Sequence, residues 1–559
     1  MNWTTHTVSN QVPDLQNYNL FSTDTALQEG IQQHHAGWHS DALRAYGAQL
    51  GQPGTIALGE LANRHLPELN SHDRTGHRID RVDFHPAWHD LLSLLRQQRL
   101  HALPWQEPRR GAQAARAAGY YLQAQIESGS LCPTTMTFAS IPVLQKEPAL
   151  FEQLKDKLYS DKHDARDLPL AQKHSILIGM GMTEKQGGSD VRTNTTRATL
   201  AEANGTGGRG QWYQLTGHKW FFSAPMCDAH LVLAHSAGGL SCFFVPRWRA
   251  DGSKNPVQVQ RLKDKLGNRS NSSSEVEFLA ADGLMIGEEG RGIPTIIEMA
   301  NLTRLDCVIG SSALMRQALV QAIHHARHRL AFGKLLAEQP LMQNVLADLA
   351  LESEAATALM LRLANAADST GSDTSGNSGN PALEQAWRRI MTPAAKFWVC
   401  KRAIEFSGEC MEVWGGNGYV ENGPMARLYR EAPVNSIWEG SGNVMCLDVL
   451  RAIGRDVEGA QLLLGELAGS PSSPCRQLVK EVAALMNLSP DEQAFHARLL
   501  AQKLVLATQC HLLASSAPGW VAEAFAQSRC TAAHGRVFGG LTGFTSKQAA
   551  TILKRAFPQ

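Results

Sequence analysis

The stretch MGMTEKQGGSDV, residues 180–191, leaves a short apolar run and opens into a loop that contains adjacent glycines and two hydroxyl side chains. The run before it, ILIGM, is typical of a β-strand. The loop offers free backbone N–H groups and the hydroxyls of Thr183 and Ser189, which suit a pyrophosphate or the polar edge of a flavin ring. An ordinary β-turn explains the same residues, so the loop alone leaves both interpretations open.

Further short apolar or alternating runs follow this loop as far as about residue 280. They read WYQLTG, HLVLAH, LSCFFVP, VQVQRL and SEVEF, separated by Gly, Asn, Asp and Pro, and this spacing predicts a compact β domain. On both sides the apolar residues instead recur every three to four positions, as in WHDLLSLLRQQRLHAL (88–103) and LMRQALVQAIHHARHRLAF (314–332). The fold class is therefore expected to be α+β and mainly helical.

A chain of 559 residues is too long to form one core. We expect an N-terminal helical domain (1–178), a middle β domain (179–290), a helical bundle domain (291–450) and an extra C-terminal helical domain (451–559). The segment DSTGSDTSGNSGN (368–380) is too poor in apolar residues to pack, and it predicts a flexible loop between two bundle helices.

The overall charge excludes a globally basic protein but leaves a local basic patch possible. There are 53 Lys and Arg against 52 Asp and Glu, whereas the part from residue 449 onward has eleven against seven. The ten cysteines are scattered without a C-x-x-C pair, so we expect neither a metal site nor a disulfide framework. The N-terminus lacks the features of a signal peptide, and no apolar stretch is long enough to cross a bilayer. We therefore expect a cytoplasmic protein without a membrane partner.

Four more motifs carry chemically useful groups, and each also has an ordinary structural explanation. GHKWFFS (217–223) places aromatic rings before a hydroxyl, which fits a flat ring system or simple core packing. KDKLGNRSNSSSEVEF (263–278) adds an arginine in a loop. HRLAFGK (328–334) ends a helix, where its cations suit the helix dipole or a phosphate on another subunit. VWGGNGYVENGPMARLYREAPVNSIWEGSGN (413–443) joins a glycine turn to Glu439, which is either a catalytic base or a loop acid.

The order of these motifs is more specific than any one of them. Together they resemble the acyl-CoA dehydrogenase superfamily, whose usual forms are T-E-P-x-x-G-S-D, G-x-K-x-W-I-T-N, K-M-G-x-R-x-S, R-x-x-F-G, G-G-x-G and Y-E-G-T. The resemblance covers residues from about 40 to 455. The strings GMGMTEKQGGSDV, GHKWFFS, SCFFVPR, LKDKLGNRSN and PVNSIWEGSGN, together with the extra C-terminal unit, resemble the alkylation-response branch of that superfamily.

The resemblance implies a helical N-terminal domain, a middle β barrel and a four-helix bundle, with FAD as the cofactor. It also implies a homotetramer, built as a dimer of dimers, in which Arg329 and Phe332 reach the FAD of a neighbouring subunit. Phe221, Phe222 and Ser223 are expected to line the flavin face opposite the substrate. The residues that it assigns to FAD binding are Met182, Thr183, Gly188, Ser189, Phe221, Phe222, Ser223, Arg329, Phe332, Gly415, Gly416, Asn417, Gly418, Trp438, Ser441 and Asn443.

Glu439 matches the catalytic glutamate of the superfamily. A carboxylate in a dry slot beside a flavin can take the acidic α proton of a thioester while the β hydrogen leaves as hydride. The sequence departs from the common dehydrogenases at Lys185 and Gln186 and at the bulky Phe221 and Phe222. A roomy acyl pocket is therefore not guaranteed by the presence of Glu439.

Two functions follow from the resemblance. The first is a flavoprotein that binds double-stranded DNA, protects or repairs it in the response to alkylation, and retains weak dehydrogenase activity on an acyl-CoA such as isovaleryl-CoA. The second is a dedicated short- or branched-chain acyl-CoA dehydrogenase that passes electrons to an electron-transferring flavoprotein. For the first, Arg451 matches an arginine at the start of the C-terminal unit, and Arg529 and Arg536 are further candidates for phosphate contacts.

Overall fold

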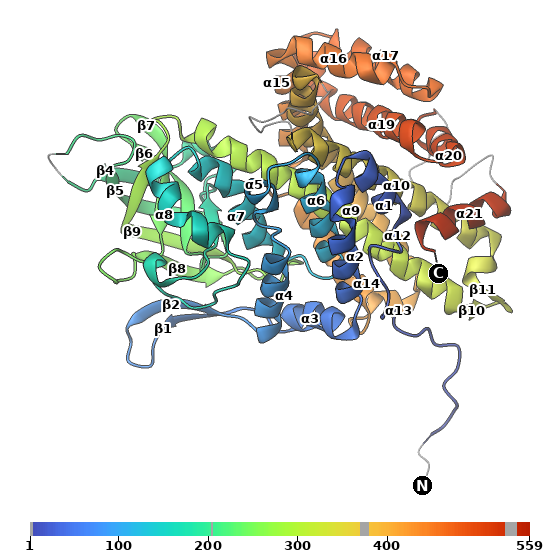
Figure 1. Ribbon diagram of the computed structural model, residues 1–559, viewed down its shortest axis with the longest axis horizontal. Coiled ribbons are helices and arrows are strands. Elements are labelled where there is room, and N and C mark those ends of the chain that lie inside the picture. Colours follow the sequence, from blue (N-terminus) through green and yellow to red (C-terminus); the bar gives the residue numbers. More distant parts are fainter. Residues whose placement is uncertain (1–3, 203–204, 369–379, 532–544, 559) are drawn as a thin grey trace. The chain divides into compact units, whose positions relative to one another are not determined.

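The structure of the protein, a computed structural model, describes residues 4–202, 205–368, 380–531 and 545–558 (Figure 1). Contacts between residues divide the chain into two compact units. The first unit comprises Met1–Pro53, Arg109–Gln125 and Cys307–Gln559, and the second comprises Gly54–Pro108 and Ile126–Asp306.

A closed β barrel lies in the second unit. Its seven-stranded sheet has the order β3-β6-β4-β5-β9-β7, and β8 pairs with β9. An additional antiparallel pairing of β6 with β7 closes the sheet, so these strands leave no open edge between them. The strands are β3 (Ile178–Gly181), β4 (Arg197–Leu200), β5 (Trp212–Ser223), β6 (Ala229–Ser236), β7 (Gly239–Pro246), β8 (Val257–Leu262) and β9 (Ser273–Ile286).

Alternating side chains along these strands fill the barrel. In β5, Tyr213 and Leu215 are buried while Trp212 is exposed, which is the period of two expected for a strand with one face in a core. The buried rings of Phe243 and Phe278 pack in the same core cluster. The short apolar runs that predicted this domain are therefore its inward-facing strand positions.

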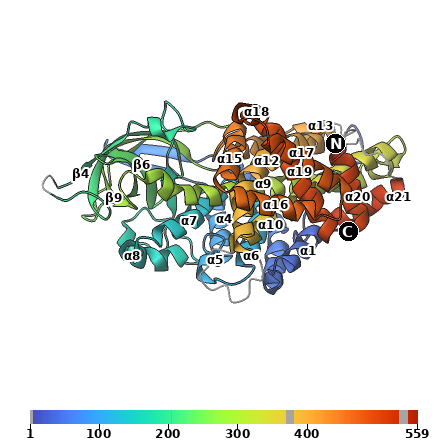
Figure 2. The same cartoon turned by 90° about the horizontal axis from the view of Figure 1, so that it is seen from above.

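Helices and one hairpin complete the second unit. The helices are α3 (Pro53–Arg64), α4 (Pro86–Gln97), α5 (Leu103–Gln106), α7 (Leu131–Leu144) and α8 (Pro148–Tyr159), with short 3-10 turns η2 (Leu170–Gln172) and η3 (Val191–Thr193). Helix α7 packs against β3, on one side of the barrel strands in Figure 2. The hairpin of β1 (Glu68–His72) and β2 (Arg78–Asp83) was not predicted, because its polar strands lack a clear apolar alternation.

The first unit is a bundle of long helices. They are α9 (Gly292–His328, which starts in the second unit), α10 (Pro340–Asp368), α11 (Pro381–Ala386), the π-helical turn η5 (Trp387–Met391), α12 (Thr392–Val413), α13 (Gly416–Tyr419) and α14 (Pro424–Asn435). The short elements η4 (Leu336–Glu338), β10 (Leu330–Ala331) and β11 (Lys334–Leu335) lie between α9 and α10. From the N-terminal part, α1 (Thr25–Gln33), η1 (Gly37–His39), α2 (Ser40–Leu50) and α6 (Ala112–Ala124) also belong to this unit.

The C-terminal helices pack on the bundle within the same unit. They are α15 (Gly442–Arg455), α16 (Val457–Ala468), α17 (Ser473–Met486), α18 (Pro490–Phe495), α19 (Ala497–Ser516), α20 (Gly519–Arg529) and α21 (Ser546–Ala556). Helix α19 contacts α10, α12, α15 and α17, and its neighbour α17 runs beside it in Figure 1. The C-terminal helical region predicted from the sequence is thus continuous with the bundle core.

The fold class predicted from the sequence is confirmed: helical regions precede and follow a middle barrel. Residues 369–379 of the predicted 368–380 loop lie outside the described residues, while Asp368 ends α10 and the Asn380 side chain caps α11. Among the described residues, no helix is both long enough and apolar enough to span a bilayer.

Candidate functional site

The loop after β3 is organised by the buried carboxylate of Glu184. Its Oε1 accepts hydrogen bonds from Thr196 Oγ1 at 2.6 Å and from Lys219 Nζ at 2.7 Å. Its Oε2 accepts from the backbone N–H of Thr195 at 2.6 Å and from Gln186 Nε2 at 2.8 Å. One side chain therefore fixes both ends of the loop that the glycine motif predicted.

The pair of Glu184 and Lys219 is fully buried, with neither side chain exposed. Burial opposes ionisation of Glu184, but the Lys219 ammonium and the surrounding donors outweigh it and lower the pKa of the carboxyl to about 2. Burial lowers the pKa of Lys219 to about 8, with Glu184 acting in the opposite direction. Both groups are thus charged at neutral pH, and each compensates the other.

The predicted binding residues of this loop form a turn with an exposed tip. Glu184 and Gly187 exchange backbone hydrogen bonds of 3.1 and 3.3 Å, and Gly188 and Ser189 follow on the exposed side. A Cβ on Gly188 would come within 2.6 Å of Thr183 Oγ1, so only glycine fits there without a shift. The Met182 carbonyl accepts from Asn194 Nδ2 at 2.9 Å, which ties the start of the turn to its end.

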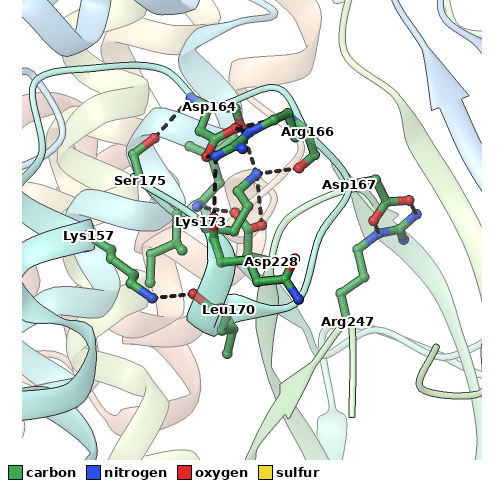
Figure 3. Close-up of polar contacts among 12 residues, drawn as sticks. Lys157, Asp164, Arg166, Asp167, Leu170, Lys173, Ser175, Asp228 and Arg247 are labelled. Carbon is green, nitrogen blue, oxygen red and sulfur yellow. Dashed lines mark hydrogen bonds and ion pairs between the residues drawn. The ribbon is translucent and has the colours of Figure 1, made fainter. Parts of the chain in front are cut away.

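Segment 160–177, which leads into β3, is held by its own set of polar contacts (Figure 3). Lys173 Nζ donates to the carbonyls of Asp164 and Arg166 at 2.7 and 2.6 Å, and it forms an ion pair with Asp228 at 3.2 Å. Asp228 Oδ2 in turn accepts from the Leu177 N–H at 2.8 Å. These contacts therefore fix the position of the segment that precedes β3, the strand that leads into the glycine loop.

The prediction that Phe222 lines the flavin face is wrong. Its side chain is 1% exposed and its ring stacks on His230 at 4.0 Å inside the barrel, so it does not line an outer face. The neighbouring Phe221 is 54% exposed, and Ser223 is partly buried at the end of β5. A register shift between Lys219 and Phe222 places both of these side chains inward. Phe221 and Ser223 remain the candidates for contact with a flat ring.

Arg329 and Phe332 lie in the first unit, around the β10–β11 hairpin. The guanidinium of Arg329 donates to the carbonyl of Asn10, and the Asn10 side chain bonds both backbone groups of Leu330 at 2.8 Å. Phe332 sits at the tip with φ 53°, and its side chain is 98% exposed. A bulky residue in the left-handed region is strained, so an exposed ring held there suggests a binding role.

The glycine turn follows α12 and is tethered by Trp414. The indole Nε1 donates to the Gln321 carbonyl at 3.1 Å, and the indole stacks on His325 at 4.8 Å. Gly415 has φ 60° and ψ −143°, a conformation that is essentially restricted to glycine. A Cβ on Gly415 or Gly416 would enter open space, Asn417 is exposed and Gly418 is buried. The turn thus presents bare backbone at the surface.

Glu439 lies in a short loop between α14 and α15. It has φ 58°, and the next residue, Gly440, has φ 108°. Trp438 Nε1 donates to Asn435 Oδ1 at 3.1 Å, so the loop folds back on the end of α14. Lys396 Nζ, from α12, donates to the carbonyls of Asn435 at 3.0 Å and Gly440 at 2.8 Å. Glu439 is therefore carried by a strained loop that is held at both ends.

Ser441 and Asn443 begin α15, next to this loop. Ser441 is exposed at the N-cap position, and Asn443 Oδ1 accepts from Arg498 Nε of α19 at 2.9 Å. The structure therefore groups the predicted residues into two sets, one in each unit. The set in the second unit surrounds the Glu184 loop and the end of β5, and the set in the first unit comprises the hairpin, the glycine turn and the Glu439 loop.

The three arginines predicted for DNA differ in their surroundings. Arg451 is on α15, its side chain is 54% exposed, and it pairs with Asp448 at 2.9 Å. Arg529 is 4% exposed and its guanidinium pairs with Asp348 and with Glu352, so its prediction as a phosphate contact is wrong: burial in an ion-pair network removes it from the surface. Arg536 lies outside the described residues.

Sequence models of known families match three parts of the chain. The "Adaptive response protein AidB N-terminal domain" matches residues 10–165, and the acyl-CoA dehydrogenase middle and C-terminal domains match residues 179–280 and 290–454. The "Putative acyl-CoA dehydrogenase AidB" of Escherichia coli strain K12 is 53% identical over 468 residues, which cover 83% of this chain and 83% of that protein. The chain belongs to the acyl-CoA dehydrogenase family.

Solved structures of the family agree with the fold. Caenorhabditis elegans ACDH-11, crystallised with C11-CoA, has a TM-score of 0.83 at 24% identity and covers 100% of this chain and 98% of its own. An acyl-CoA dehydrogenase from Bacillus anthracis, solved as a complex with FAD, has a TM-score of 0.62 at 18% identity and covers 84% of this chain and 82% of its own. Both likenesses show that this chain has the acyl-CoA dehydrogenase fold.

Family membership supports FAD, the cofactor predicted from the motifs, and the described residues fit it. An exposed ring at Phe221 suits a flat ring system, and the bare backbone of Gly415 and Gly416 leaves room that a side chain would fill. The N–H groups and hydroxyl of the turn at Gly188 and Ser189 suit a pyrophosphate.

Three buried residues that support these sets were missed by sequence reasoning. Glu184 and Lys219 lie within the glycine and aromatic motifs but were not singled out, and Lys396 lies outside every motif considered. The signal that could have found them is a charged residue inside an otherwise apolar strand or helix face, because such residues are rarely fully buried without a partner.

Proposed function

We propose that the chain is an FAD-dependent oxidoreductase of the acyl-CoA dehydrogenase type, with Glu439 as the catalytic base. The observation that carries the proposal is the loop of residues 435–440. Its strained backbone at Glu439 and its two contacts with the buried Lys396 fix the backbone from which the Glu439 side chain projects. Strain of this kind persists where the surrounding structure fixes it, and it is concentrated at functional sites.

In this proposal, Glu439 takes the α proton of the acyl thioester on a carboxylate oxygen. When bound, FAD supplies the acceptor for the hydride that leaves the β carbon. The Glu184 network keeps the glycine loop and the end of β5 fixed, so that Ser189, Phe221 and Ser223 hold the cofactor. Exclusion of water by the aromatic side chain of Trp438, the residue before Glu439, would strengthen the base.

The proposed substrate is an acyl-CoA with a short or branched chain, such as isovaleryl-CoA, turned over slowly. Acyl-CoA binding is supported by the C11-CoA complex of the Caenorhabditis elegans relative. The expectation of slow turnover comes from the likeness to the alkylation-response branch of the superfamily.

We further propose a homotetramer, a dimer of dimers, in which Phe332 contacts the cofactor of a neighbouring subunit. Its side chain is 98% exposed at a strained hairpin tip, so within its own unit it stabilises nothing by burial. A contact with another subunit's cofactor accounts for both features.

The proposed activity is tested by adding isovaleryl-CoA and C11-CoA, separately and without oxygen, to the purified FAD-loaded protein. Bleaching of the flavin absorbance by either thioester supports the proposal. Fast bleaching that is followed by electron transfer to an electron-transferring flavoprotein would favour a dedicated dehydrogenase. An oxidised flavin after long incubation with both thioesters would overturn the proposed activity.

A second candidate function is binding of double-stranded DNA in the response to alkylation damage, by protection or repair. The observation that favours it is a pair of exposed arginines on α15. Arg451 and Arg455 lie one turn apart on the exposed face of this helix. Surface arginines of this kind bind phosphates without reading the sequence. A salt series with labelled duplex DNA tests it, because phosphate binding weakens steeply with salt; the absence of binding at low salt would exclude it.

A further inference from the structure

We propose that Lys396 is a positioning residue for Glu439, and that its ammonium sets the conformation of the loop from which the base acts. The expected effect of Lys396 on turnover rests on the proposed role of Glu439 as the base. Its effect on the conformation of the loop does not. Lys396 lies in α12, about forty residues before the loop in sequence, and no motif of the sequence singles it out.

The lysine is buried and its contacts with the loop are to backbone carbonyls. Its side chain is 1% exposed, and Nζ donates to the Asn435 carbonyl at 3.0 Å and to the Gly440 carbonyl at 2.8 Å. These two residues delimit the loop, and Glu439 lies between them. One nitrogen atom therefore brings both ends of the loop to the same point.

The position of each carbonyl explains why a cation is required. Asn435 is the last residue of α14, where carbonyls have no partner within the helix and where the helix dipole favours positive charge. Gly440 directly precedes Ser441, the N-cap of α15. A neutral apolar side chain at position 396 would leave both carbonyl oxygens buried without their donor, which is costly. An ammonium satisfies both at once.

The loop also needs an external constraint, because its backbone is strained. Glu439 has φ 58°, a region that glutamate rarely adopts. Gly440 has φ 108°, and a Cβ there would come within 2.4 Å of Met445 Cε. Relaxation of Glu439 to an ordinary φ would turn its carboxylate in another direction. The hydrogen bonds of Lys396 to the residues on both sides oppose that relaxation.

The test compares the FAD-loaded wild type with Lys396→Met, Lys396→Arg and Lys396→Gln. The control is Lys503→Met, which removes a partly buried lysine of α19 that pairs with Glu481 of α17. Hydrogen–deuterium exchange is measured at residues 437–440, where the amides of Ile437 and Trp438 donate to the Val434 carbonyl at 3.0 Å. Isovaleryl-CoA-dependent flavin reduction is measured on the same samples, with kcat and KM determined separately.

Lys396→Met is expected to speed exchange at residues 437–440 by roughly tenfold to a hundredfold, the range for loss of a charge-assisted hydrogen bond. Exchange in Lys396→Arg is expected to fall between that of the wild type and that of Lys396→Met, and Lys503→Met is expected to match the wild type. In Lys396→Met, kcat is expected to fall more than KM changes. Should Lys396→Met fail to fold, Lys396→Gln, which keeps one donor group, is expected to show the same effect in smaller degree.

Wild-type exchange rates in both Lys396→Met and Lys396→Gln would overturn the inference. The two claims would be separated if Lys396→Met sped up loop exchange while the wild type did not reduce its flavin with isovaleryl-CoA. In that case Lys396 holds the loop, and the proposed dehydrogenase function fails on its own.

Discussion

Glu184 Oε1 and Lys219 Nζ lie 2.7 Å apart with both side chains completely buried, directly beneath the loop that carries Thr183 and Ser189. A buried pair of this kind contributes little net stability compared with an apolar pair, but it is strongly destabilising to break. The carboxylate also bonds the backbone on the far side of the loop, at Thr195 and Thr196. The pair therefore supports the proposed cofactor-binding surface of the second unit.

Removal of one partner of this pair is expected to be costly. Glu184→Gln leaves the Lys219 charge buried without a carboxylate, so the unfolding free energy should fall by about 3–5 kcal/mol. The double variant Glu184→Gln with Lys219→Met should lose less, because no charge stays behind. Urea unfolding of the FAD-free proteins measures both.

The exposed pair of Glu288 and Arg291, with side chains 76% and 63% exposed, provides the control. Glu288→Gln should cost no more than about 1 kcal/mol, because surface ion pairs are screened by solvent. If Glu184→Gln cost as little as Glu288→Gln, the Glu184 network would not hold the loop.

Phe332→Gly separates a binding role from a structural one. Glycine adopts φ 53° without strain and the ring is 98% exposed, so the thermal stability of the isolated subunit should not fall. The FAD content and the tetramer fraction should fall, because the variant lacks the ring that we propose contacts the neighbouring cofactor. Flavin absorbance after gel filtration and light scattering measure these two quantities.

Phe495→Ala is the matched control for this experiment. Its ring is 84% exposed on α18 and has no proposed contact with the cofactor, so the FAD content should match the wild type. A Phe332→Gly protein with full FAD content and unchanged mass would show that the hairpin tip does not reach a cofactor.

Arg451→Ala should weaken DNA binding, whereas Arg529→Ala should lower folding stability. Arg451→Ala removes an exposed cation, so it should weaken duplex binding equally for all sequences and lower the salt slope by about 1, with no loss of stability. Arg529→Ala removes the buried cation that Asp348 and Glu352 share and leaves Arg402 as the remaining ion-pair partner of Glu352, so it should lower the unfolding free energy by about 3–5 kcal/mol.

Fluorescence anisotropy of labelled duplex DNA at several salt concentrations, combined with thermal unfolding, measures these effects. Unchanged binding by Arg451→Ala at every salt concentration would remove α15 from the DNA surface. Arg455→Ala, one turn further along α15, shows whether a loss of DNA binding is specific to Arg451 or is shared by the exposed face of the helix.

Folding stability should decline below about pH 6.5 because of buried histidines. Burial lowers the pKa of His230 to about 3, and burial likewise lowers the pKa of His34 and of His163 to about 3. Between pH 6.5 and 3 the unfolded chain therefore binds more protons than the folded one, so stability rises with pH across this window and is lost as the pH falls.

Each such histidine contributes a slope of up to about 1.4 kcal/mol per pH unit. The melting temperature should fall as the pH is lowered from 7 to 5. His230→Gln should reduce this dependence of the melting temperature on pH, although it lowers stability overall. The exposed His77→Gln variant serves as the control. A His230→Gln protein with the wild-type pH dependence would show that His230 does not carry this effect.

The sequence predicted the barrel because its strands are short apolar runs, as in HLVLAH of β6, where residues 229–234 are all buried. It predicted the bundle because apolar residues recur every three to four positions, as in LMRQALVQAIHHARHRLAF at the end of α9. Both signals are local, since each depends only on residues within one element. The β1–β2 hairpin carries no such local signal and was missed.

The supporting charges could not be predicted because their partners are far apart in sequence. Arg529 looks like one more cation of a basic C-terminal region, yet it pairs with Asp348 and Glu352 of α10. Phe221 and Phe222 are adjacent and chemically alike, but the register shift in β5 decides that only Phe222 is buried. Such outcomes depend on the closed fold and not on the pattern of one segment.

The central claim, that Glu439 is the base of a flavin-dependent acyl-CoA dehydrogenation, is tested most directly by Glu439→Gln. The variant and the wild type, both loaded with FAD, are mixed without oxygen with isovaleryl-CoA, and the flavin absorbance is followed in time. Glu421→Gln, an exposed carboxylate paired with Arg430 in the same region of the chain, is the control. We predict that wild type and Glu421→Gln bleach, while Glu439→Gln keeps its FAD and bleaches about 10²–10⁴-fold more slowly. Bleaching of Glu439→Gln at the wild-type rate would contradict the account.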